Sequence, residues 1–206
     1  VKIIGNWRYN SDGIDFANCR DCSVEDSFIR AFDDCLCVKG YESFGRWLYR
    51  LRLVDDTPAT GRLSVDGVQG SFAELQRRFG DYPCPQEYCG DIRVQRCVIW
   101  CDWGRPFEIG AETVVDEIRN LLFENCDIIH NTGGSAMSVQ NADRALCRDI
   151  VFRGIRVEAD DEPLRPIVVK RRDESYDAKY DGYLPALIRL ANQVGCVWTD
   201  TERGLI

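Results

Sequence analysis

The chain has 206 residues, enough for one sizeable domain, and its 45% hydrophobic and 29% charged residues are typical of a soluble globular protein. The net charge of −8 makes a nucleic-acid partner unexpected, because a surface that binds phosphates is basic. No apolar run approaches the roughly 20 residues of a membrane-spanning helix, so no membrane partner is expected either. Residues 1–4 lead directly into strand-like sequence, so we expect no signal peptide within residues 1–206. The first residue, Val1, and the final "ERGLI" suggest a segment of a longer chain.

Short strands recur along the chain in a common pattern. The pattern occupies residues 22–40, 91–110, 120–141 and the beginning of 147–160. Each copy opens with an alternating strand that turns one apolar residue inward: Val24, Val94, Phe123 and Phe152. Three positions later comes a small residue: Ser27, Cys97 or Cys126. After a polar turn, a second strand closes the copy at residues 36–38, 107–109 or 136–138.

Repeats of about 20–30 residues are too small to bury their own apolar face, so they indicate a solenoid. We therefore predict an all-β fold, a right-handed parallel β-helix, with its coils in residues 1–160. The alternative is a β-sandwich of hairpins. Hairpins would need two-residue Asn-Gly or Asp-Gly turns at regular spacing, and these are mostly missing.

Two segments interrupt the repeat. Residues 41–90 form an insertion in which 71–80 has helical spacing, with Ser71 as N-cap and Gly80 as stop. We expect this insertion to protrude from one coil and to wall a groove. Residues 161–206 are predicted to form an irregular C-terminal tail that packs on the solenoid.

The chain has eleven cysteines, an odd number that leaves at least one thiol unpaired. We expect most of them to pack as small buried hydrophobic residues, with some disulfides or a metal site as alternatives. Cys84 and Cys89, in a proline-rich loop, are the best candidates for a disulfide. A zinc site needs more partners than the Cys-x-x-Cys at 19–22, and the sole histidine, His130, is expected to have a structural role at a turn.

Three carboxylates stand where a strand core would be expected. Asp12 precedes the Asp33-Asp34 pair by 21 residues, about one coil, so all three are predicted to converge on one face. Like charges held together separate their pKa values, and one protonated acid beside one carboxylate is what glycosidic hydrolysis with inversion requires. Ordinary turns, such as an Asx turn at residues 10–13, and a Ca²⁺ site are the alternatives.

The sequence also resembles a known family. "NSDGID" at 10–15 and "DDCLCVKG" at 33–40 resemble the "NTDG … DDC-x-x-x-K" signature of family 28 glycoside hydrolases, the polygalacturonase-like enzymes. "GRPFEIG" at 104–110 stands where that family has "GHG-x-S-I-G", and the resemblance covers about residues 1–160. It implies a right-handed parallel β-helix, hydrolysis with inversion, no cofactor, and an extracellular or periplasmic location.

The resemblance also implies roles for individual residues. Asp33 would be the general acid, Asp12 and Asp34 would orient and activate the water, and Asn10 and Lys39 would support them. The family's histidine and following glycine fall at Arg105 and Pro106, and its Arg-x-Lys pair falls on Ser-Val-Gln at 138–140. A uronate substrate would lack its cations there.

We therefore expect a carbohydrate substrate, a polysaccharide or oligosaccharide that is neutral or charged differently from polygalacturonate. Glu108 and Gln140 are predicted to bind sugar hydroxyls, with Glu112 reaching the groove. The faces of Trp103 and Tyr9 suit sugar rings, although core packing is the alternative for both. Two other functions remain open: a β-helix lyase with a Lys or Arg base and Ca²⁺, and a non-catalytic glycan-binding β-helix.

Overall fold

The computed structural model describes residues 1–6, 10–41, 51–53, 63–79, 88–131, 135–160, 186–193 and 204–206. The chain divides into two compact units, one formed by Val1–Tyr41 together with Tyr88–Ile206 and the other by Glu42–Glu87. In these described ranges, no helix combines the length and apolar character that crossing a membrane requires.

Three parallel sheets build the larger unit. Sheet A contains, in spatial order, β1 (Lys2–Asn6), β4 (Phe28–Ala31), β10 (Val98–Cys101), β13 (Asp127–Asn131) and β16 (Arg156–Ala159). Sheet B contains β2 (Ile14–Ala17), β5 (Leu36–Gly40), β11 (Phe107–Thr113), β14 (Met137–Asn141) and β17 (Ile188–Asn192). Sheet C contains β3 (Arg20–Glu25), β9 (Tyr88–Gln95), β12 (Glu117–Glu124) and β15 (Leu146–Arg153).

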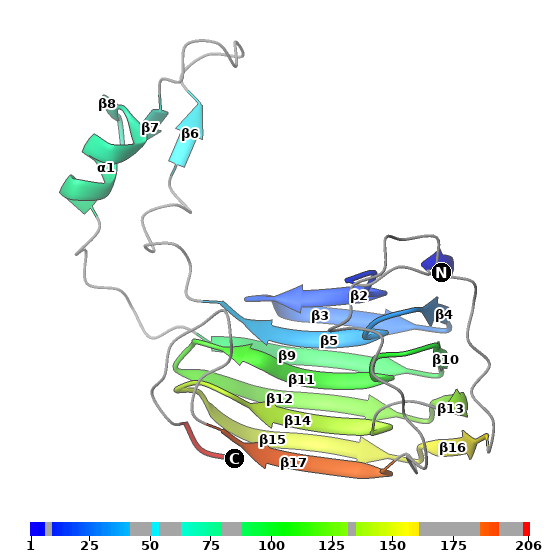
Figure 1. The fold of residues 1–206 in the computed structure, drawn as a ribbon. Helices are drawn as coiled ribbons and strands as arrows, with labels where there is room; N and C mark the ends of the chain where they lie inside the picture. Colours follow the sequence, from blue (N-terminus) through cyan, green and yellow to red (C-terminus); the bar gives the residue numbers. More distant parts are fainter. Residues whose placement is uncertain are drawn as a thin grey trace, which may run out of the picture. The chain divides into compact units, whose positions relative to one another are not determined.

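The chain passes through these sheets in a fixed order, A then B then C, and each passage is one repeat. Neighbouring strands within each sheet therefore come from successive repeats and pair in parallel; Val98 pairs with Asp127, which pairs with Arg156. Figure 1 shows the strands of sheet B one below another in sequence order, from β2 to β17. The predicted all-β class with parallel strands is confirmed.

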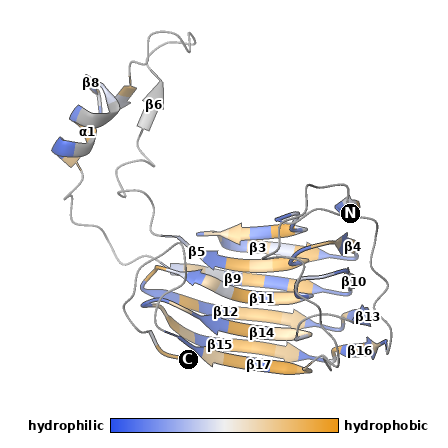
Figure 2. Cartoon of the chain, in the orientation of Figure 1, coloured by the Kyte–Doolittle hydropathy of each residue, from blue (hydrophilic) through white to orange (hydrophobic). Residues whose placement is uncertain are grey.

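One predicted apolar position forms a continuous column. Val24, Val94, Phe123 and Phe152 are register partners across sheet C. Val94 and Phe123 are buried, and the Phe123 ring lies 4.9 Å from that of Phe152 and 4.8 Å from that of Phe107. Hydrophobic residues also run along the stacked strands of sheet B (Figure 2). This column supplies the apolar surface that no single repeat can bury alone.

The predicted alignment of the second strand was wrong by one residue in the third copy. Residues 36–38 pair with 107–109 as expected, but Phe107 pairs with Met137 and Ile109 with Val139, not with 136 and 138. A shift of one residue exchanges the two faces of a strand. As a result Met137 and Val139 join the core, whereas Ser138 lies beside Glu108.

The nine cysteines within the described ranges are free thiols, and seven of them are buried. Packing as small hydrophobic residues is therefore the role the structure gives most of them. The expected Cys84–Cys89 disulfide is wrong, because Cys89 is a free thiol buried in β9; Cys84 lies outside the described residues. Burial raises the pKa of the Cys89 thiol to about 12, which disfavours the reactive thiolate.

Left-handed residues mark the corner between sheets C and A in successive repeats. Asp26, Arg96, Asn125 and Gly154 have φ values of 49°, 53°, 53° and 61°. Asn, Asp and Gly tolerate this conformation best, which explains the polar punctuation of the sequence. Arg96 is the exception, and its side chain forms ion pairs with Asp26 and Glu25 of the preceding repeat.

The smaller unit contains β6 (Leu51–Leu53), β7 (Leu63–Val65) and β8 (Val68–Gly70), which form an antiparallel sheet, and α1 (Phe72–Phe79). The predicted N-cap is confirmed: the Glu74 N–H bonds the Ser71 hydroxyl at 3.4 Å, and the Ser71 N–H bonds the Glu74 carboxylate at 2.8 Å. Leu75 and Phe79 pack against Val65. Gly80, the predicted stop, lies outside the described residues.

β17 adds a further strand to sheet B within the segment that was expected to be an irregular tail. Its residues pair in parallel with those of β14, and Leu205 forms a bridge with Leu146. Nothing in the sequence pattern indicated β17, since it follows β16 by far more than the usual spacing of the repeat. Residues 161–185, between the two strands, lie outside the described residues.

Replacing Phe123 by Ala tests the apolar column. We expect the free energy of unfolding to fall by about 3–5 kcal/mol, because the change leaves a cavity between the rings of two neighbouring repeats. Urea denaturation followed by circular dichroism measures the effect. Val151→Ala, at a position 40% exposed on β15, is the control and should cost much less. Equal losses for the two variants would contradict a column that holds the repeats together.

Candidate functional site: stacked turns before sheet B

Three turns stack where the chain enters sheet B. They lie at residues 10–13, 33–35 and 104–106, just before β2, β5 and β11. Backbone hydrogen bonds join them: the Gly13 N–H donates to the Asp34 carbonyl at 2.8 Å, and the Cys35 N–H donates to the Arg105 carbonyl at 2.9 Å. These contacts place the turn that carries Asp12 beside the turn that carries Asp33 and Asp34, as their spacing of about one repeat predicts.

Glycine allows the turns to approach this closely. A Cβ atom on Gly104 would lie 2.6 Å from the backbone of Asp33 and of Asp34. A Cβ atom on Gly13 would lie 2.3 Å from the Cys35 carbonyl oxygen. Both contacts are shorter than carbon atoms tolerate, so a side chain at either position would push the carboxylate-bearing turns apart.

Asp33 is held by backbone donors from its own turn and from the preceding one. Its Oδ2 accepts the Asn10 N–H at 3.0 Å, and its Oδ1 accepts the Asp34 N–H at 3.1 Å. Burial raises the pKa of the Asp33 carboxyl and the charge of Asp12 raises it further, against the lowering effect of these donors. The protonated form is thereby favoured relative to an exposed aspartate.

Asp34, like Asp33, is partly buried. Its Oδ1 accepts the Arg105 N–H at 2.8 Å from the next repeat. Burial, followed by the negative charges of Glu108 and Asp33, raises its pKa well above the ordinary value, while the Arg105 guanidinium opposes the shift. The carboxylates of the two neighbouring residues thus repel each other in a poorly solvated place.

Asp12 is paired with a cation. The Lys39 Nζ donates to Asp12 Oδ2 at 2.8 Å and to Asp15 Oδ2 at 2.9 Å. Burial disfavours the ammonium form of Lys39, but Cys37 and these two carboxylates together outweigh burial and raise the pKa of Lys39. Lys39 therefore stays protonated, and Asp12 faces a permanent positive charge.

Arg105 and Glu108 form a second charged pair. Arg105 Nε lies 3.3 Å from Glu108 Oε2, and the Glu108 side chain is only 1% exposed. The pair is not aligned for hydrogen bonding, because Arg105 Nε and both Glu108 oxygens are buried without a hydrogen-bond partner. Burial raises the pKa of Glu108, and the Arg105 charge partly offsets the increase.

Polar groups without partners continue along sheet B. Glu108 pairs in register with Cys37 on one side and Ser138 on the other, and Ser138 pairs with Arg189. The Ser138 hydroxyl and the Gln140 Oε1 are also buried without hydrogen bonds. Each such group costs about 1–3 kcal/mol unless something else satisfies it, and Glu108 and Ser138 are fully buried.

The remaining predicted residues lie around this centre or away from it. Trp103 is stacked on Phe32, with centroids 5.9 Å apart, at the turn that carries Gly104. Glu112 lies near the other end of β11. There, the burial of Tyr41 and, to a smaller extent, the negative charge of Glu112 raise the pKa of Tyr41 to about 12. The pairing of β11 with β5 shifts its register between Ile109 and Thr113, the stretch that contains Glu112. Tyr9 lies outside the described residues.

Sequence reasoning missed two members of the cluster. Asp15 shares Lys39 with Asp12, and its position in the strand, three residues after Asp12, was a usable signal. The Cys37 thiol donates to the Gly110 carbonyl at 3.2 Å and lies 3.9 Å from Asp34 Oδ2. Nothing in the sequence distinguished Cys37 from the cysteines of the core.

Comparison with known proteins adds no relatives to this description: no protein-family model, no curated protein and no solved structure matches the chain. The site therefore has to be interpreted from its own chemistry.

Asp34→Asn tests the electrostatic cost of the cluster. The pKa of the Asp34 carboxyl in the folded protein is raised above 3.8, so the folded protein binds this proton more tightly than the unfolded chain does. Its contribution to stability is therefore present at low pH and is lost as the pH rises through the pKa of the folded state. The Asn side chain keeps an oxygen for the Arg105 N–H but carries no charge. We therefore expect Asp34→Asn to gain stability over the wild type as pH rises from about 4 to 8, measured by urea denaturation at each pH.

Asp26→Asn is the control with the opposite sign. Arg96 lowers the pKa of the exposed Asp26 carboxyl, so its stabilising effect is present at neutral pH and is lost as pH falls through that lowered pKa. Asp26→Asn should destabilise the protein at neutral pH, with the difference vanishing in acid. A difference between Asp34→Asn and wild type that does not grow with pH would show that Asp34 bears no buried charge.

Proposed function

We propose that the three parallel sheets form a right-handed parallel β-helix and that the chain is a glycoside hydrolase acting with inversion. The observation that carries this proposal is the stacking of Asp12, Asp33 and Asp34 on adjoining turns, with raised pKa values at two of them. The resemblance of residues 10–15 and 33–40 to the polygalacturonase-like enzymes supports it.

In the proposed reaction the aspartates divide two tasks. Asp33, in the role that the resemblance gives it, donates its proton to the glycosidic oxygen as the bond to the anomeric carbon breaks. A proton on Asp33 also removes part of the repulsion on Asp34, which can then ionise beside Arg105. Asp34 and Asp12 orient a water on the opposite face of the sugar and accept its proton as its oxygen bonds to the anomeric carbon.

The charges of the site favour a substrate without carboxylates. Lys39 is occupied by Asp12 and Asp15, and Arg105 lies against Glu108. A uronate would have to compete with these carboxylates for its cation. Glu108, Ser138 and Gln140 instead offer oxygens to sugar hydroxyls, so we propose a neutral polysaccharide or oligosaccharide as the substrate. The raised pKa of Lys39 also argues against a lyase that uses it as the base.

A screen of reducing-sugar release over pectic, glucan and mixed glycans tests the hydrolase. With the best substrate, Asp33→Asn should lower the rate by about 10²–10⁴-fold, because the variant cannot donate the acid proton. Asp26→Asn, a change of the same kind at an exposed corner, should leave the rate unchanged. Proton NMR of the first product should show the inverted anomer.

Other outcomes would favour other functions. Equal hydrolysis by Asp33→Asn and wild type would contradict the role of Asp33 as acid. A calcium-dependent unsaturated product would indicate a lyase. Binding of a glycan without release of reducing ends, unaffected by Asp33→Asn, would indicate a non-catalytic glycan-binding protein.

A further inference from the structure

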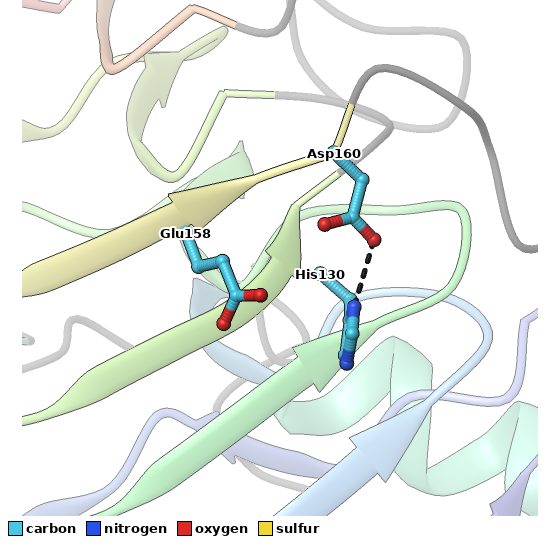
Figure 3. A group of neighbouring side chains, drawn as sticks. All are labelled: His130, Glu158 and Asp160. Atoms are coloured by element: carbon cyan, nitrogen blue, oxygen red, sulfur yellow. Dashed lines mark hydrogen bonds and ion pairs between the residues drawn. The ribbon is translucent and has the colours of Figure 1, made fainter.

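A histidine and two carboxylates meet on sheet A, away from the stacked turns. His130 lies near the end of β13, Glu158 lies in the neighbouring β16, and Asp160 follows β16 directly. One nitrogen or oxygen from each side chain lies within 4.8 Å of the other two (Figure 3). His130 Nδ1 and Asp160 Oδ2 are already 2.7 Å apart.

The imidazole is held in place by its neighbours before any ligand binds. Its ring centroid lies 4.3 Å from that of Trp100 in the preceding repeat. The Arg30 guanidinium lies 3.8 Å from the Trp100 ring and is itself fixed to Asp102 by two hydrogen bonds of 2.9 and 3.0 Å. A ring held in this way loses little rotational freedom on binding a ligand.

Among the described residues, neither carboxylate has a lysine or arginine as its partner. Glu158 makes no hydrogen bond or ion pair with any residue in the described ranges, and Asp160 makes an ion pair there only with His130. The nearest arginine along β16, Arg156, contacts both carboxylate oxygens of Asp127 instead. The site therefore collects negative charge around one nitrogen ligand.

We propose that His130, Glu158 and Asp160 bind a divalent transition-metal ion. One imidazole nitrogen with two carboxylate oxygens is a donor set that suits ions such as Mn²⁺ or Zn²⁺ and leaves positions for water. Ligand atoms about 2.0–2.2 Å from a metal lie about 3–3.6 Å apart, so the group must contract slightly. Glu158 is exposed and unpaired, and its side chain can supply that movement.

A metal at this place would join two successive repeats, because its ligands come from β13 and from the end of β16. Binding to the folded chain alone would stabilise it, with an effect that depends on the metal concentration. The proposal does not depend on the proposed hydrolase activity, since none of the three ligands belongs to the stacked turns.

Mn²⁺ is the probe of choice, because it prefers oxygen and nitrogen ligands, whereas Zn²⁺ would also bind the free cysteines. Electron paramagnetic resonance of free Mn²⁺ measures binding to the full, chelator-treated chain. We expect one site in the wild type and at least tenfold weaker binding in His130→Gln and in Glu158→Gln. Mn²⁺ should also broaden the ring signals of His130, the only histidine of the chain, in the NMR spectrum.

Asp149→Asn is the control, because it removes the same charge as Glu158→Gln. Asp149 lies at an exposed, left-handed position of β15, where Asn is tolerated. The Asp149→Asn variant should bind Mn²⁺ as the wild type does. Circular dichroism checks that each variant is folded; Glu158→Gln keeps the test valid if His130→Gln does not fold. Wild-type affinity in a folded His130→Gln or Glu158→Gln variant would mean adventitious binding to surface carboxylates and would overturn the proposal. So would the absence of Mn²⁺ binding by the wild type.

Discussion

Parallel pairing between successive repeats is the constraint on which the rest of this structure depends. The strands of one repeat pair with the equivalent strands of the repeats before and after it. A residue in a strand therefore lies beside the residues at the same position in those two repeats. For apolar positions the consequence is favourable, since Val94 and Phe123 bury surface that neither repeat could bury alone. For charged positions the same geometry is hazardous, because it places similar residues at van der Waals distance.

Elsewhere on the surface the hazard is avoided by alternating charges. Arg156 contacts Asp127, Arg153 contacts Glu124, and Arg148 contacts Glu117, in each case one repeat away. The stacked turns before sheet B depart from this rule, since carboxylates there face other carboxylates and two of them have raised pKa values. The departure lies at turns in which Gly13 and Gly104 allow the backbones of neighbouring repeats to approach closely, so a side chain at either position would push the turns apart.

The sequence allowed prediction of features that depend on periodicity. The column of Val24, Val94, Phe123 and Phe152 follows from alternation alone, and the approach of Asp12 to Asp33 follows from their spacing of one repeat. The slip at Ala136 arose because Ala136 and Met137 are both apolar, so the pattern could not fix the register. β17 and the short strands of the smaller unit depend on tertiary pairing, which the repeat pattern of the sequence does not contain.

Glu108 shows most clearly why the site calls for a functional explanation. Its register neighbours, Cys37 and Ser138, carry no positive charge, and the effect of its burial is offset first by the charge of Arg105 and then by Ser138, Arg189 and Lys39. That compensation is incomplete, because the ion pair leaves both carboxylate oxygens and the Arg105 Nε without hydrogen bonds. A hydrophobic residue at position 108 would avoid this cost. A sugar hydroxyl both donates and accepts, so it could satisfy the carboxylate, and the cost of the unbound state would then be recovered when substrate binds.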